Sequence, residues 1–138
     1  MNKSLGNKKL LEKRKIGFIA CDISVTNGTT ALIAKTTLGW AEKISSEADA
    51  VMVSGFHSTL EKSVLKYLLQ GKCGIIVVLA RGMYRRLPKM YQVAMDENRL
   101  LIIALEKDSV TRVTKRAACR RDKYVKKIAN ECREVFLM

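Results

Sequence analysis

Short apolar runs alternate along most of this chain with segments in which apolar residues recur at helical spacing. Four runs are apolar enough to form buried strands: 16–21, 51–53, 74–80 and 100–105. The run at 74–80 is fully apolar and rich in β-branched residues, which is typical of a central parallel strand. Helices are expected over 31–44, 60–69 and 89–97. Strands that alternate with helices predict an α/β fold with a mainly parallel sheet of about five strands.

The last part of the chain predicts a long amphipathic helix over 116–133, followed by a fifth strand over 135–138. On a helical wheel Arg121 falls toward the apolar side, where it either reaches an edge or points into a ligand cleft. Apolar and small residues occupy that side: Ala118, Val125, Ile128, Ala129 and Cys132. A narrow basic stripe occupies the other: Arg116, Arg120, Lys123 and Lys127. Such a stripe is either a solvated face or a contact for nucleic acid, because like charges at this spacing repel one another.

The chain carries a large excess of basic residues. The 138 residues include 26 Lys and Arg against 13 Asp and Glu, a formal net charge of +13. This excess favours polyanionic partners such as nucleic acid. We expect a basic N-terminal arm over 1–14, either solvated or acting as an electrostatic tether, and a single domain over 15–138.

The cysteines and the longest apolar runs bear on the compartment. Cys21, Cys73, Cys119 and Cys132 form no close pair, and His57 is the only histidine, so we expect no metal site. Cys73 lies beside an apolar run and Cys132 on an apolar helix face, which is typical of small core residues in a reducing compartment. No run approaches the ~20 residues of a membrane span, and the N-terminus lacks the apolar stretch of a signal peptide. These features predict a cytoplasmic protein without a membrane partner.

Four loops should gather at the carboxyl ends of the parallel strands, where ligands bind in such sheets: 22–30, 54–59, 81–88 and 106–115. Their hydroxyls, glycines and cations suit phosphate. Ser54, Gly55, Ser58 and Thr59 stand at a strand-to-helix turn, where the helix dipole and unpaired N–H groups attract an anion. The first loop adds Ser24, Thr26 and Gly28. Cations that could neutralise neighbouring phosphates are Arg81, Arg85, Arg86, Arg120, Arg121 and Lys123.

Catalytic groups are sparse in these loops. The only candidates for acid–base chemistry are Asp22, His57 and Glu61. Each has a structural explanation: Asp22 caps a turn, His57 is a loop residue, and Glu61 belongs to the first turn of a helix. Dinucleotide and P-loop motifs are absent. We therefore predict no catalytic residue, no metal and no cofactor. Aromatic residues on which bases could stack are Phe56, Tyr84, Tyr91 and Tyr124.

Residues 16–130 resemble the Rossmann-like domain of the DprA/Smf family of DNA-processing proteins, within a wider superfamily of SLOG-type nucleotide-binding domains. Residues 20–28 occupy the place of its first Gly-Ser-Arg loop. Residues 53–61 are similar to its Ser-Gly-x-Ala-Arg-Gly-Ile-Asp signature. Residues 77–88 and 120–123 are similar to its apolar strand and late Arg-Asn-Arg motif. The resemblance implies a Rossmann-like three-layer sandwich, binding of single-stranded DNA and a recombinase partner.

This sequence departs from the family at several positions. The family's first-loop Arg falls at Asp22, its signature Arg at Ser58 and its late Asn at Asp122. The Pro-Gly-Gly-x-Gly-Thr…Glu motif of related phosphoribohydrolases is missing. Three hypotheses stay open: a non-catalytic protein that binds single-stranded DNA, a protein that binds or hydrolyses a small nucleotide, and a scaffold that only self-associates as a homodimer.

Overall fold

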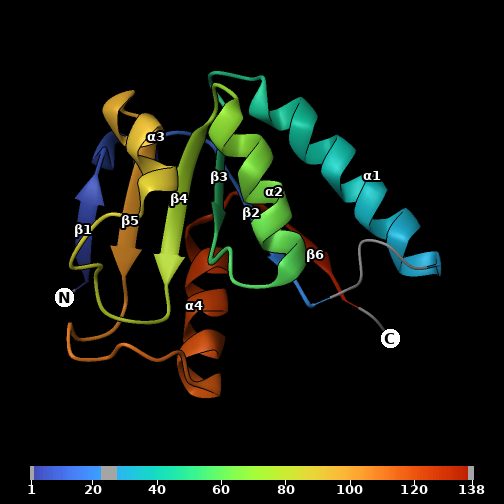
Figure 1. The fold of residues 1–138 in the computed structure, drawn as a ribbon. Helices are drawn as coiled ribbons and strands as arrows, with labels where there is room; N and C mark the ends of the chain where they lie inside the picture. Colours follow the sequence, from blue (N-terminus) through green and yellow to red (C-terminus); the bar gives the residue numbers. More distant parts are fainter. Residues whose placement is uncertain (1, 23–27, 137–138) are drawn as a thin grey trace.

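A six-stranded sheet forms the centre of the computed structural model, which describes residues 2–22 and 28–136 (Figure 1). The strands are β1 (Lys3–Gly6), β2 (Lys15–Ala20), β3 (Val51–Ser54), β4 (Gly74–Leu79), β5 (Leu100–Ala104) and β6 (Glu131–Val135). Their order across the sheet is β1-β5-β4-β3-β2-β6. All neighbouring strands are parallel except β1, which pairs antiparallel with β5.

Helices cover both faces of the sheet, which makes three layers (Figure 1). The elements are η1 (Lys8–Glu12), α1 (Gly28–Ser45), α2 (Thr59–Gln70), η2 (Lys89–Tyr91), α3 (Gln92–Asp96) and α4 (Lys115–Ile128). Residues of α1, α2 and α3 pack against one face, and residues of η1 and α4 pack against the other. Alternate side chains of β4 serve the two cores: Ile75 and Val77 face the first, and Ile76 and Val78 face the second. The predicted Rossmann-like α/β sandwich is thereby confirmed.

The end of the chain differs from the prediction. The expected helix over 116–133 ends at Ile128, and the next strand is β6 rather than 135–138. Ala129 has extended backbone, and the Asn130 side chain accepts a hydrogen bond from the Lys15 N–H at 2.7 Å. Asn130 also donates its own N–H to the Lys15 carbonyl oxygen. These bonds align the following residues with β2, so tertiary pairing overrides the apolar periodicity that continues to Cys132.

The segment expected as a basic arm contains two of the ordered elements. Strand β1 extends the sheet beyond β5, and the η1 residue Leu10 is buried in the second core. Lys15 is also buried, and its ammonium donates to the carbonyl oxygens of Leu11 and Lys13. Residues 3–15 are therefore tied to the sheet by backbone pairing and by one apolar anchor.

Arg99 closes the C-terminal end of α2 from a neighbouring loop. Its guanidinium donates to the carbonyl oxygens of Leu68, Leu69 and Cys73 at 2.9–3.2 Å. A helix leaves its last carbonyls without partners inside the helix, so a cation placed there satisfies them and complements the helix dipole. The ion pair from Arg99 to the exposed carboxylate of Glu97 is a further contact.

We expect Arg99→Ala to lower the free energy of unfolding by about 2–3 kcal/mol, because hydrogen bonds from a charged group to buried acceptors are lost. Urea denaturation monitored by circular dichroism measures this change. Glu97→Ala is the matched control and should cost less than about 1 kcal/mol, as exposed ion pairs do. Equal effects of the two variants would contradict the helix-closing role.

Candidate nucleic-acid interface

The N-terminus of α2 is built by side chains that satisfy its backbone locally. Ser54 is fully buried at the end of β3, and its hydroxyl oxygen accepts the Phe56 N–H at 3.1 Å. Ser58 is the N-cap residue, and its hydroxyl oxygen accepts the Glu61 N–H at 3.2 Å. The Ser-x-x-Glu sequence forms a complete capping box, which fixes where the helix begins.

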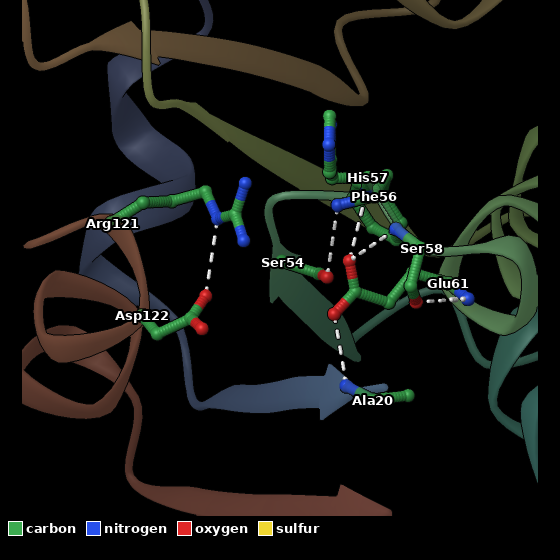
Figure 2. Close-up of polar contacts among 8 residues, drawn as sticks. All are labelled: Ala20, Ser54, Phe56, His57, Ser58, Glu61, Arg121 and Asp122. Atoms are coloured by element: carbon green, nitrogen blue, oxygen red, sulfur yellow. Dashed lines mark hydrogen bonds and ion pairs between the residues drawn. The ribbon is translucent and has the colours of Figure 1, made fainter. Parts of the chain in front are cut away.

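Carboxylates of the chain occupy the donors at this helix end. Glu61 is 2% exposed, and its Oε1 atom accepts the N–H groups of His57 and Ser58 at 2.7 and 3.2 Å. Its Oε2 atom accepts the Ala20 N–H at 2.9 Å, which joins α2 to the end of β2 (Figure 2). The Asp22 carboxylate accepts both the N–H and the hydroxyl of Thr59, and these bonds lower the pKa of Asp22. A phosphate bound through Ser54, Gly55, Ser58 and Thr59 would therefore have to displace internal carboxylates.

A cleft opens beside this turn, at the carboxyl ends of β3 and β4. It has a volume of about 410 Å³, which is within the range of small-ligand sites. Cations, aromatic rings and aliphatic side chains line it together. The residues that carry its chemistry are Gly55, Lys62, Lys66, Arg81, Tyr84 and Arg121. Three of the four expected loops line the cleft, those over 54–59, 81–88 and 106–115, whereas the described residues of the loop over 22–30 do not.

Arg121 is the most unusual residue of the cleft. It is only 6% exposed, although it lies on a helix whose other cations face solvent. Its Nε atom pairs with Asp122 at 3.1 Å, and the guanidinium points toward the loop that carries Ser54 and Phe56 (Figure 2). Among the described residues its two Nη groups have no hydrogen-bond acceptor, and they reach the surface, because no buried side-chain nitrogen in this part of the chain lacks a partner. Of the two directions expected for this side chain, the structure has the one into the cleft.

Gly55 makes room for that guanidinium. A Cβ atom at Gly55 would lie 2.4 Å from Cδ and 2.5 Å from Nε of Arg121, far inside van der Waals contact. The φ angle of Gly55 does not lie in the left-handed region, so the backbone conformation does not require glycine at this position. Phe56 is the residue of the turn with positive φ, at 49°. Glycine is required here for space rather than for backbone freedom.

The opposite wall of the cleft carries an aromatic pair and a second cation. The rings of Tyr84 and Tyr91 have centroids 6.4 Å apart, and the Arg81 guanidinium lies over the Tyr84 ring at 5.2 Å. Burial raises the pKa of the Tyr84 hydroxyl. Tyr91 is buried, whereas Tyr84 is partly exposed. Tyr84 therefore offers a ring on which a base could stack.

The predicted cations do not all meet in one place. Arg81 and Arg121 line the cleft, and Arg85 and Arg86 are exposed on the loop after Arg81. The remaining two, Arg120 and Lys123, line a different groove, and Arg120 forms a two-point ion pair with Glu106 at 2.8 and 3.3 Å. Ser24 and Thr26, expected in the first loop, lie outside the described residues.

Lys62 and Lys66 are cleft residues that the sequence analysis does not identify. They stand one helical turn apart on α2, and both are exposed. The signal that could have found them is their spacing of four residues beyond the strand-to-helix turn, which directs both side chains to one face of the helix.

Metal-ligand clusters and membrane-spanning helices are two further features that bear on the function of the site. Within residues 2–22 and 28–136, no group of three or more His, Cys, Asp or Glu side chains is placed to hold a metal ion. The described helices include none that is long and apolar enough to cross a membrane.

No known family model and no curated protein matches this sequence. In three dimensions the chain is similar to bacterial DNA-processing proteins. One is DNA processing protein A (DprA) from Streptococcus pneumoniae, with a TM-score of 0.70 and 17% identity over 96% of this chain and 45% of that one. Another is DprA from Helicobacter pylori, with a TM-score of 0.70 and 16% identity over 96% of this chain and 59% of that one. This chain thus has a DprA-like fold and spans about half the length of those proteins.

Proposed function

We propose that this chain is a non-catalytic protein that binds single-stranded DNA through the cleft of Arg121. The observation that carries the proposal is a guanidinium at the cleft whose two Nη groups reach the surface and have no acceptor among the described residues. Asp122 pairs only with the Nε atom of Arg121, so both Nη groups stay available to an anion in the cleft. A phosphate oxygen pair matches the remaining donors, because guanidinium binds phosphate with two parallel hydrogen bonds.

The composition of the cleft favours a strand of nucleic acid over an isolated anion. Lys62, Lys66 and Arg81 supply further positive charge around Arg121, and Tyr84 supplies an aromatic ring. Grooves that bind single strands combine these two features, cations for the backbone and rings for the bases. The H. pylori neighbour is described as binding single-stranded DNA in a unique mode, which agrees with this proposal.

The phosphate site proposed at Arg121 differs from the site that the sequence predicts, which is the N-terminus of α2. Glu61 and Asp22 already accept the N–H groups of the α2 N-terminus. Arg121 stands on the other side of the Gly55 turn, where it offers donors without such competition. Gly55, Arg81 and Arg121 therefore stay in the proposed site, with Arg85 and Arg86 beside it, while Ser54, Ser58 and Thr59 support the turn.

A small nucleotide is the second candidate ligand, because the volume of about 410 Å³ suits a molecule of that size. Affinity for a mononucleotide would depend weakly on salt and strongly on the base, whereas affinity for a DNA strand falls steeply with salt. If the site hydrolysed nucleotides, Glu61 would be the first candidate for a catalytic group. Its burial and its three backbone hydrogen bonds support a structural role instead.

The test is binding of fluorescent dT25 and of mononucleotides at two salt concentrations. Arg121→Ala should weaken dT25 binding by about 10- to 100-fold, since a charged pair to phosphate is lost. Arg85→Ala/Arg86→Ala should weaken it less and leave thermal stability unchanged, because both residues are exposed. Lys35→Ala, an exposed cation of α1, is the control. Unchanged dT25 affinity in Arg121→Ala would refute the proposal, and base-selective, salt-insensitive binding would favour the small nucleotide.

A further inference from the structure

We propose that the outer face of α4 is a second phosphate-binding surface, along which a bound single strand continues after it leaves the cleft. This proposal rests on the proposed function for its ligand. It concerns a different surface, whose failure to bind would leave the cleft proposal intact.

The first observation is the concentration of charge. Helix α4 contains seven Lys and Arg residues and one Asp within 14 residues, a formal charge of +6. The whole chain carries +13. Nearly half of the net charge thus lies on one helix. Such a field attracts a polyanion and raises its rate of association.

The second observation is the arrangement of these cations. Arg116, Arg120, Lys123 and Lys127 are all exposed on one face of α4, while Ala117, Arg121 and Val125 are buried. At a rise of 1.5 Å per residue the four cations span about 16 Å. Among the described residues, no acidic side chain lies within 4.0 Å of the charged groups of Arg116, Lys123 and Lys127. Of the four cations only Arg120 forms an ion pair, with Glu106. The four repelling charges therefore form a regular row that an external polyanion would stabilise.

The third observation is a groove beside this row. It has a volume of about 330 Å³, and its lining includes Arg120, Lys123, Lys127 and the partly buried ring of Tyr124. It shares no residue with the cleft of Arg121. Cations next to an aromatic ring repeat the combination found in the cleft, which favours a nucleic-acid strand over an acidic protein segment as the occupant.

The two surfaces lie on different sides of the same helix. Arg121 points into the cleft. Arg120 and Lys123, which flank Arg121 and Asp122 in the sequence, line the groove. A helix is about 10 Å across. A strand longer than a few nucleotides can therefore contact both surfaces, whereas the dinucleotide pTpT is too short to fill both.

The experiment compares two triple variants that each reduce the net charge by three. The test variant is Arg116→Gln/Lys123→Gln/Lys127→Gln, which keeps Arg120 and its ion pair with Glu106. The matched control is Lys35→Gln/Lys43→Gln/Lys72→Gln, which removes three exposed cations elsewhere. Anisotropy of labelled dT25 over a range of salt concentrations gives the affinity and its salt dependence, and an NMR titration gives pTpT affinity. Thermal unfolding verifies that both variants fold.

We expect the test variant to lose about tenfold or more of its dT25 affinity at low salt. Its plot of log K against log salt should become shallower by about 2, since each single-strand phosphate contact contributes about 0.7. The control should change both quantities much less, and pTpT binding should be equal in the two variants. Arg121→Ala should weaken both ligands; if it weakens neither, the cleft proposal fails. Equal dT25 affinity and salt dependence in test and control, or a loss of pTpT binding in the test variant alone, would overturn the second surface.

Discussion

Gly55→Val is expected to abolish binding of single-stranded DNA and to lower the free energy of unfolding by about 1–3 kcal/mol, the usual cost of overpacking. The new side chain would occupy the space of the Arg121 guanidinium, since even a Cβ atom lies 2.4 Å from its Cδ. Arg121 has rotatable bonds and can move away, so most of the stability should survive. The displaced guanidinium, however, no longer presents its Nη groups to the cleft. Anisotropy with dT25 and urea denaturation measure the two effects.

Gly39→Val is the matched control for this substitution. Gly39 lies in α1, where nothing lies within 4 Å of an added Cβ atom. Valine should be tolerated there, with DNA affinity unchanged, because its helix propensity is no worse than that of glycine. Normal binding by Gly55→Val would show that the position of Arg121 does not determine affinity, and the proposed site would have to be abandoned.

Glu61→Ala is expected to cause the largest loss of stability of any single substitution considered, about 3–5 kcal/mol. Its carboxylate accepts hydrogen bonds from the N–H groups of Ala20, His57 and Ser58. Without it, the buried N–H groups of Ala20 and Ser58 and the part-buried N–H of His57 lose their acceptor, and the end of β2 loses its connection to α2. Urea denaturation monitored by circular dichroism measures the difference from the wild type.

Glu42→Ala, an exposed carboxylate of α1, is the control and should change stability by less than about 0.5 kcal/mol. Glu61→Gln keeps one carbonyl oxygen and should fall between the two. A Glu61→Ala protein as stable as the wild type would contradict the structural role. Release of free base or ribose phosphate by the wild type, lost in Glu61→Gln, would instead support the hydrolase hypothesis.

The sequence predicts the centre of the fold well, because the strands β2 to β5 are buried on both faces and are apolar apart from Lys15 and Ser54 at strand ends. The two outer strands carry no such signal. Strand β1 is exposed along its length and owes its place to backbone pairing with β5. Strand β6 mixes charged and apolar residues, and Cys132 fits the apolar face of the preceding helix equally well. What fixes β6 is the contact between Asn130 and Lys15, which no local pattern contains.

The candidate site is predictable in its residue types but not in its geometry. The Ser58–Glu61 capping box can be identified from its spacing. The hydrogen bond from the Ala20 N–H to the second oxygen of Glu61 cannot be identified from the sequence, because it depends on how β2 and α2 pack. Likewise, a helical wheel gives the direction of Arg121 around the helix axis but not the segment that packs against it. The close approach of Gly55 decides which way the guanidinium points. The separation of Arg121 from Arg120 and Lys123 also follows only from the packed helix.

The order of strands in the sheet affects how fast the chain folds and which strands pair last. Lys3 pairs with Ala104, and Ile16 pairs with Glu131, so both outer pairings join segments that are far apart in sequence. Contacts of this kind require closure of long loops and slow down folding. During synthesis on a ribosome, β2 emerges early and its outer edge stays uncovered until β6 follows. Among the described residues β6 is an outer strand of the sheet, and its exposed charges Glu131 and Glu134 disfavour pairing with the strands of other chains.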